Sequence, residues 1–174
     1  MKKTNEIILQ LQSVDQMLML PESPFYPNRM LSPDAEEFLA EEAATQPYHA
    51  RVYLKVHLPS EAANRAHEIE SAIHKHFAYL KNKSERKLKQ TLQLGWRSLL
   101  ISIVFLSLLI SLATFAAQLL PEGGLSITFR EALVILGWVA LWRPADLLLY
   151  EWRPFKREVN LFSRLEQCKV EIII

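Results

Sequence analysis

The chain has 174 residues, of which 50% are hydrophobic and 22% are charged, and its formal net charge at pH 7 is +1. This charge provides no global positive field of the kind that nucleic-acid binding uses. The only cysteine, Cys168, excludes a disulfide framework and indicates a reducing compartment for its part of the chain. The mixture of apolar and charged residues predicts two zones in different solvents: a small domain and a membrane element.

The N-terminal segment carries two lysines and a short apolar run, and it lacks the h-region and cleavage site of a signal peptide. Membrane insertion is therefore expected to depend on internal segments. Residues 6–12 (EIILQLQ) are typical of a short strand. Residues 20–33 hold four prolines and predict a loop. Within it, Phe25 and Tyr26 either fill the core of a small domain or, with Arg29, form a docking surface for a partner.

A helix is expected over residues 33–45, because a serine N-cap and a proline at the first helical position precede acidic residues. Residues 48–59 alternate between apolar and polar side chains, which predicts a half-buried strand with Val52, Leu54 and Val56 on its buried face.

A long helix is expected from Ser60, its N-cap, to residue 96, because no glycine or proline precedes Gly95. This helix is expected to continue directly into the membrane. Its predicted buried stripe consists of Ala62, Ala66, Ile69, Ile73, Phe77 and Leu80.

Three side chains on this helix are candidate metal ligands. His67, Glu70 and His74 are spaced i, i+3 and i+7, so they share one helix face, and they are suitable ligand types for zinc or another divalent ion. The alternative interpretation is a solvated polar face. His76 falls on the opposite side and is expected to be a buried histidine.

Residues 98–120 are 23 residues without a charge. About 20 apolar residues span the hydrocarbon core of a bilayer, so a first transmembrane helix is predicted at residues 97–120. A buried core helix is the alternative, but a domain this small cannot enclose such a segment on all sides.

A second transmembrane helix is predicted at residues 128–150, where Glu131 and Arg143 bracket eleven uncharged residues. That stretch is short for a span, and snorkelling arginine side chains extend it. The alternative is a helix that lies on the membrane surface.

Basic residues gather before the first span and after the second, whereas the connecting turn at residues 121–127 is poor in them. Because lysine and arginine accumulate on the cytoplasmic side, both termini are predicted to be cytoplasmic and the turn external. The basic residues concerned are Lys81, Lys83, Arg86, Lys87, Lys89, Arg97, Arg143, Arg153, Lys156 and Arg157.

The stretch WRPADLLLYEWRP, residues 142–154, is expected where the second helix leaves the hydrocarbon. Arg143 and Asp146 are spaced for pairing on one helix face, and Pro144 is expected to kink the helix. Residues 145–152 are then expected to bend into the interface as a short amphipathic turn, which Pro154 ends. The stretch is either an interfacial anchor or a polar functional site at membrane depth. The predicted cluster consists of Trp142, Arg143, Asp146, Glu151, Trp152 and Arg153.

The last residues, CKVEIII, are typical of a third strand. The predicted fold class is an α+β membrane protein, a two-helix transmembrane hairpin plus a small cytoplasmic α/β domain in the order β-α-β-α-TM-TM-β. The predicted parts are a cytoplasmic domain at 1–96 with its long helix 60–96, spans at 97–120 and 128–150, an external turn at 121–127, and a cytoplasmic tail at 151–174 whose strand joins the N-terminal domain.

The sequence contains no glycine-rich phosphate loop and no GxSxG, HExxH or CxxC motif. These absences favour a non-enzymatic scaffold or regulatory or accessory subunit, without a cofactor, that self-associates or docks on a membrane complex. Its expected partners are membrane lipid and either further copies or another membrane protein, and no nucleic acid.

Two alternative functions remain open. One is a homo-oligomeric ion channel with Arg143, Asp146 and Glu151 at its cytoplasmic mouth, and the other is a metal-responsive membrane protein. A channel needs a polar stripe, and the candidates in the first span are serines that do not fall on one face: Ser98, Ser102, Ser107 and Ser111.

Several stretches resemble a family of uncharacterised bacterial two-span membrane proteins. They are SPFYPNRMLSPDAEEFLAEEA, VHLP, HFAYL and GWVALWRPADLLLYEWRPFKRE, and GWVALWRP with LYEWRP is the most specific part. The resemblance covers nearly the whole chain. It implies a bacterial inner-membrane setting and adds no catalytic role.

Overall fold

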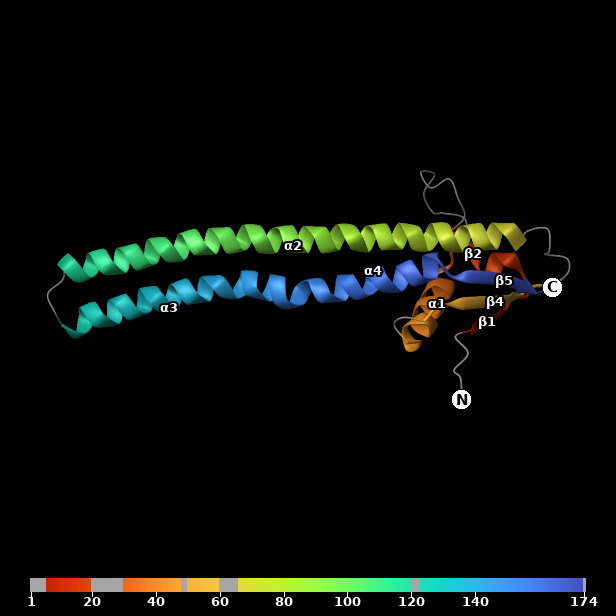
Figure 1. The fold of residues 1–174 in the computed structure, drawn as a ribbon, viewed down its shortest axis with the longest axis horizontal. Helices are drawn as coiled ribbons and strands as arrows, with labels where there is room; N and C mark the ends of the chain where they lie inside the picture. Colours follow the sequence, from red (N-terminus) through yellow and green to blue (C-terminus); the bar gives the residue numbers. More distant parts are fainter. Residues whose placement is uncertain (1–5, 20–29, 48–49, 60–65, 120–122, 174) are drawn as a thin grey trace. The chain divides into compact units, whose positions relative to one another are not determined.

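The chain forms two compact units in the computed structural model: an α/β unit made of Met1–Ser84 and Arg157–Ile174, and a hairpin unit made of Glu85–Lys156. Figure 1 shows the elements of each unit. The structure describes residues 6–19, 30–47, 50–59, 66–119 and 123–173.

The α/β unit is built on a three-stranded parallel sheet with the order β1-β4-β5. The strands are β1 (Glu6–Gln10), β4 (Tyr53–His57) and β5 (Lys169–Ile173). The two ends of the chain therefore flank one central strand, which confirms that the C-terminal strand joins the N-terminal part. The alternation of buried and exposed side chains predicted for β4 is confirmed, because Leu54 and Val56 are buried whereas Tyr53 is exposed.

Helical segments supply the rest of this unit's core. They are α1 (Pro33–Thr45), the first turns of α2 (Ala66–Leu119) and the last turns of α4 (Trp152–Glu166). The stripe predicted on α2 is buried at Ile69, Ile73 and Phe77, and the Phe77 ring stacks on Phe162 of α4 with centroids 6.1 Å apart. A 3₁₀ turn at Val14–Gln16 and a two-stranded antiparallel sheet, β2 (Leu18–Met19) with β3 (Met30–Leu31), complete the unit.

The predicted start of α1 is confirmed. Ser32 has an extended backbone, and its Oγ accepts a hydrogen bond of 3.3 Å from the backbone N–H of Ala35. Pro33 occupies the first helical position, where a missing N–H has no consequence. The Ser32 hydroxyl in turn donates to the carbonyl of Gln16, so the cap also fixes the start of the helix to the 3₁₀ turn.

The hairpin unit consists of two antiparallel helical segments, one from α2 and one from α3 (Gly124–Asp146) and its continuation (Figure 1). Both helices are long enough and apolar enough to cross a membrane. Two glycines allow the helices to approach closely. A Cβ at Gly95 would lie 2.7 Å from Leu148 Cδ2, and a Cβ at Gly137 would overlap Leu106 Cδ1. Small residues serve this purpose in helix pairs within membranes.

The expectation that Pro154 ends a short interfacial turn after the second helix is wrong. The chain stays helical from Gly124 to Glu166: α3 is followed by a π-turn at Leu147–Glu151 and then by α4. Pro154 is the third residue of α4. It lies in the first turn after the π-turn, where the regular hydrogen-bond ladder is already interrupted, so its missing N–H does not stop the helix. Residues 152–166 are thus helical, whereas the sequence predicted only a strand in the tail.

Candidate functional site

The polar cluster predicted around WRPADLLLYEWRP forms at the π-turn of the hairpin unit. Arg143 Nη1 lies 2.5 Å from Glu151 Oε1 and 3.7 Å from Asp146 Oδ2. The two ion pairs share one guanidinium. All three side chains keep substantial exposure, at 64% for Arg143, 53% for Asp146 and 37% for Glu151.

The π-turn explains why Glu151 meets Arg143. In a regular α-helix, residues seven apart return to the same face after about two turns, and residues eight apart are rotated away by ~80°. A π-turn accommodates one extra residue. The eighth residue, Glu151, therefore takes the angular position that the seventh would otherwise occupy. The local backbone irregularity thus brings together charges that a regular helix would separate.

Pro144 is also compensated within the hairpin unit. A proline at this position cannot donate to the carbonyl four residues earlier, which is that of Ala140. The hydroxyl of Ser102 on α2 donates to this carbonyl at 2.7 Å, and Ser102 is buried. A polar side chain of one helix thus satisfies the backbone of the other. The pairing was not foreseen from the sequence, where Ser102 was considered only as a candidate pore-lining residue.

Aromatic side chains surround the cluster in two different ways. Trp142 is 72% exposed on α3. Trp152 is partly buried, and its indole N–H donates to the carbonyl of Leu148 at 2.8 Å. The Arg153 guanidinium lies over the ring of Tyr150, 5.5 Å from its centroid, and not beside Glu151. Tyr150, which lay outside the predicted cluster, therefore belongs to this surface.

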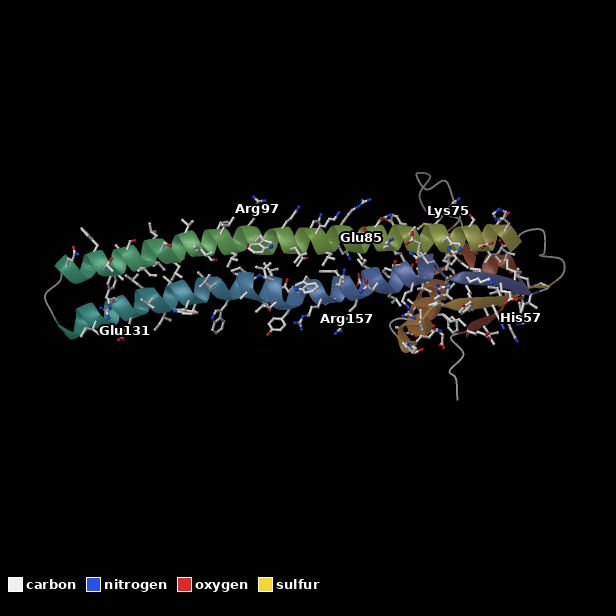
Figure 2. The ribbon with its side chains drawn as sticks, viewed as in Figure 1. His57, Lys75, Glu85, Arg97, Glu131 and Arg157 are labelled. Atoms are coloured by element: carbon white, nitrogen blue, oxygen red, sulfur yellow. The ribbon has the colours of Figure 1, made fainter. Side chains whose placement is uncertain are left out.

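Two basic residues of α2 have different surroundings within the hairpin unit. Figure 2 shows Arg97 on the side of α2 that faces away from α3. Lys87 lies over the Phe155 ring, 5.9 Å from its centroid.

The serines predicted for a pore stripe bond instead to backbone carbonyls. Ser107 and Ser111 donate to the carbonyls four residues earlier in α2, at 2.9 Å and 2.8 Å. With Ser102 bonded to Ala140, three of the four hydroxyls donate to the backbone. The channel hypothesis stays a prediction, and these bonds give it no support.

The three candidate metal ligands lie on the first turns of α2 without forming a shared centre. His74 Nε2 is 4.0 Å from Glu70 Oε1, and His74 Nδ1 contacts the backbone carbonyl of Glu166. Among the described residues, no group of three or more His, Cys, Asp or Glu side chains could hold a metal ion, and His67 is a described, exposed residue. The predicted metal site therefore has no geometric support.

Two reactive side chains of the α/β unit take part in packing. His76 is buried, as predicted, and its Nε2 lies 2.8 Å from Glu36 Oε2 on α1. The Cys168 thiol is buried, and this burial raises its pKa to about 11 against a small opposing effect of its own backbone, while the charge of Glu70 adds to the rise. A raised pKa keeps the thiol protonated and unreactive.

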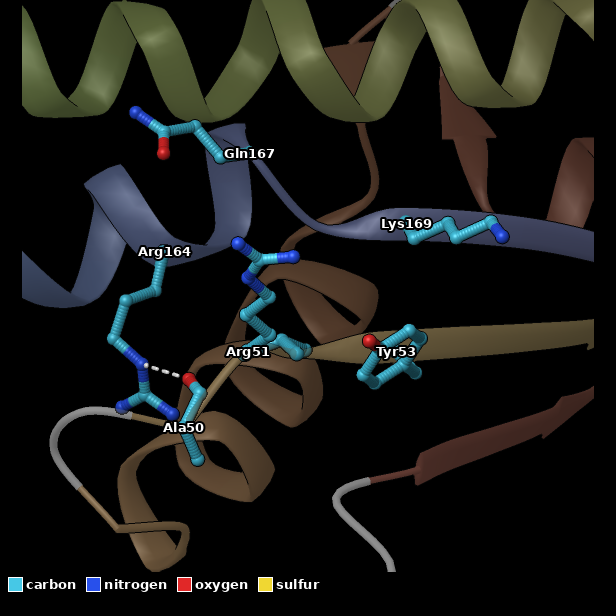
Figure 3. A pocket seen from close by; sticks show the side chains of 7 residues that line it. Ala50, Arg51, Tyr53, Arg164, Gln167 and Lys169 are labelled. Carbon is cyan, nitrogen blue, oxygen red and sulfur yellow. Dashed lines mark hydrogen bonds between the residues drawn. The ribbon is translucent and has the colours of Figure 1, made fainter.

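One cavity of about 360 Å³ opens on the α/β unit at the N-terminal ends of β4 and β5 (Figure 3). Arg164 on α4 donates through Nε to the carbonyl of Ala50 at 3.1 Å and through Nη1 to the carbonyl of Ala43 at 3.2 Å. Because Ala43 is in the last turn of α1, Arg164 caps that helix. The lining residues are Ala50, Arg51, Val52, Tyr53, Arg164, Gln167 and Lys169.

This cavity was missed at the sequence level, because its residues come from segments more than one hundred positions apart. Its lining has three cationic side chains, those of Arg51, Arg164 and Lys169, and no carboxylate. The predicted docking residues Phe25, Tyr26 and Arg29 lie outside the described residues.

Comparison of this chain with family models, with curated proteins and with solved structures gives no match. The resemblance to bacterial two-span proteins therefore stays a prediction.

Proposed function

We propose that this chain is a non-enzymatic integral protein of the bacterial inner membrane that serves as a scaffold or accessory subunit. The hairpin unit crosses the membrane twice, both chain ends are cytoplasmic, and the residues around 121–127 face outward. The protein works through association, with other copies or with a membrane complex.

The exposed apolar surface of the hairpin unit carries this proposal. In the most apolar 18-residue windows of its two helices, only 11% and 17% of the window is buried. A core helix of a soluble protein would be mostly buried, and a contiguous apolar surface of this size marks a membrane or an interface. The large exposed side chains on α2 and α3 include Leu100, Ile101, Val104, Leu108, Phe115, Ile135, Leu136 and Val139.

The positions of the charged and aromatic residues along the two helices are consistent with the proposed orientation. Trp96 and Arg97 on α2, and Trp142 and Arg143 on α3, lie near the contacts that join Gly95 to Leu148 and Ser102 to Ala140. Tryptophan and arginine gather where a helix passes from hydrocarbon to headgroups, with the basic residues on the cytoplasmic side. The polar cluster at the π-turn then lies at this cytoplasmic boundary.

The roles of the reactive side chains support a non-enzymatic function. His76 faces Glu36, His74 contacts a backbone carbonyl, Arg164 caps α1, and burial keeps the Cys168 thiol protonated. Each of these groups has a structural use, so association is the activity that the exposed surfaces favour.

The topology is tested with single cysteines in a Cys168→Ser background of the full chain. Gly123→Cys should react with a membrane-impermeant maleimide added outside intact cells, and Lys89→Cys should react only after the membrane is opened. The chain should stay in the membrane fraction after an alkaline wash. Release by that wash, or labelling of both cysteines from outside, would contradict the proposal.

The scaffold role is tested by the mass and composition of the particle extracted in mild detergent or nanodiscs, measured by native mass spectrometry. We expect several copies of this chain, or this chain with a defined second protein. A single chain with bound lipid only would argue against a scaffold.

A further inference from the structure

Two ionisable residues interrupt the apolar surface of α3 away from the π-turn. Arg130 and Glu131 lie in the second turn of the helix, which begins at Gly124, and both side chains are exposed. Glu131 is about 10 Å along the helix axis from that start, at 1.5 Å per residue. Eleven uncharged residues follow before Arg143. In the orientation proposed above, Arg130 and Glu131 are the third and fourth residues of the span predicted at 128–150 and lie at its external end.

Neither side chain forms an ion pair or side-chain hydrogen bond with another residue in the part of the chain that the structure describes. They cannot satisfy each other, because neighbours in a helix are about 100° apart and do not face each other. Arg130 is long enough to snorkel toward the external headgroups, whereas the shorter Glu131 side chain is not. Figure 2 shows Glu131 pointing away from α2.

A dimer with a two-fold axis parallel to the membrane normal would pair both charges at once. Because Arg130 and Glu131 are neighbours about 100° apart, they flank a line on the helix surface at about 50° to either side. When two copies of α3 meet along this line, the two-fold operation places Arg130 of each copy opposite Glu131 of the other at nearly the same depth. The contact is self-complementary and contains two reciprocal ion pairs.

We propose that a second copy of this chain packs on this face of α3 and that reciprocal Arg130–Glu131 pairs fix the dimer. This inference rests on the proposed membrane insertion and goes beyond it by naming the partner and the contact. Charged groups within a bilayer are rare and mark sites where a specific partner neutralises them. Here the chain itself carries the matching charge.

The same line on α3 carries apolar side chains that lack cover within the chain. At 100° per residue, Ile127, Val134 and Trp138 lie within about 30° of it. Their exposed fractions are 57%, 38% and 62%. At the same spacing, Gly137 and Ala140, which contact α2, lie about 70° and about 130° from this line, so a second copy would pack beside α2 and not in its place.

Charge reversal provides the decisive test, in the full chain reconstituted in nanodiscs or mild detergent. Arg130→Glu and Glu131→Arg should each weaken self-association by about a hundredfold or more, because each places like charges in contact. The double variant R130E/E131R should dimerise like the native chain. Coexpression of the two single variants should yield the mixed dimer, because each supplies the charge that the other lacks.

Cysteine cross-linking supplies a second readout that does not change the charges. In a Cys168→Ser background, Val134→Cys should form an intermolecular disulfide on oxidation. Leu136→Cys is the matched control: it is 50% exposed but lies about 170° from the dimer line, and it should not cross-link. Equal cross-linking at both positions would overturn the proposed face.

Insertion is measured separately for every variant by the alkaline wash and the Gly123→Cys labelling. If the native chain is inserted but monomeric, or if R130E/E131R is inserted and fails to dimerise, the dimer proposal is wrong and the proposed function stands. If the native chain is not inserted, the proposed function itself is wrong, and the dimer proposal falls with it.

Discussion

The two units use the same kinds of apolar residue and bury them in opposite ways. In the α/β unit the side chains of Ile69, Ile73 and Phe77 are 0% exposed, whereas Ile101 and Val104, further along the same helix, are each 70% exposed. In the α/β unit, burial follows helical spacing because water surrounds the other face. In the hairpin unit the apolar residues extend around the helix, and glycine and serine mark the contact instead.

The largest effect that would sharpen this comparison is expected at Phe77. Phe77→Ala should destabilise the α/β unit by about 3–5 kcal/mol, the usual cost of removing a buried aromatic ring and leaving a cavity. Hydrogen exchange at the β4 amides of the full chain in detergent would report the loss. Phe38→Ala is the control, because Phe38 is 44% exposed on α1 of the same unit, and its effect should be well under half as large.

In the α/β unit the removal of side-chain atoms is destabilising, whereas in the hairpin unit the addition of a single side-chain atom should be destabilising. Gly95→Ala should cost about 1–3 kcal/mol, because the new Cβ meets the Cγ of Leu148 and the Cβ of Leu147 and cannot be accommodated by moving one side-chain tip. Gly124→Ala, which has open space around it, should be neutral or slightly stabilising. Thermal unfolding in the same detergent would compare the two, and equal stability would contradict the close packing at Gly95.

Most of the α/β unit could be predicted from local patterns. The serine N-cap of α1, the alternation in β4 and the stripe at Ile69, Ile73 and Phe77 are all encoded in a few neighbouring residues, and each is confirmed. The joining of the last strand to the first part of the chain was also correctly inferred. Such elements depend on the contrast between an apolar core and water, which is readable from periodicity.

The sequence predicted which residues belong to the candidate site but not how they are arranged. Arg143, Asp146 and Glu151 were grouped correctly, but the π-turn that aligns the first with the last has no signature in the residue spacing. Pro154 was wrongly expected to end a short interfacial turn, because proline rules describe a regular hydrogen-bond ladder and not one already interrupted by a π-turn. The bond from Ser102 to Ala140 depends on the register of two helices, which no single segment contains.

A smaller effect on stability is expected when the hydrogen bond between Ser102 and Ala140 is removed. Ser102→Ala should destabilise the hairpin unit by about 1 kcal/mol, because the Ala140 carbonyl, to which Pro144 cannot donate, loses the hydrogen bond from the Ser102 hydroxyl. Ser107→Ala is the matched control, since its hydroxyl bonds only to a carbonyl of its own helix. If the two variants unfold at the same temperature, the interhelical bond does not stabilise the hairpin.

The effect expected at Cys168 is absent at neutral pH and appears only at high pH. Burial raises the pKa of its thiol from 9.0 to about 11, so the folded α/β unit favours the protonated form. The corresponding stability is fully present below pH 9 and is lost as the pH rises from about 9 to about 11. Unfolding free energy should therefore fall across this window in the native chain and fall less in Cys168→Ala.

At pH 8 the native thiol should also react with a small maleimide about a hundredfold more slowly than a free cysteine of ordinary pKa, because its thiolate fraction is lower by that factor. Rapid labelling of the folded chain at that pH would show that the C-terminal strand opens readily. The core of the α/β unit would then be less protected from solvent than the structure indicates, and the difference between the two units would be smaller.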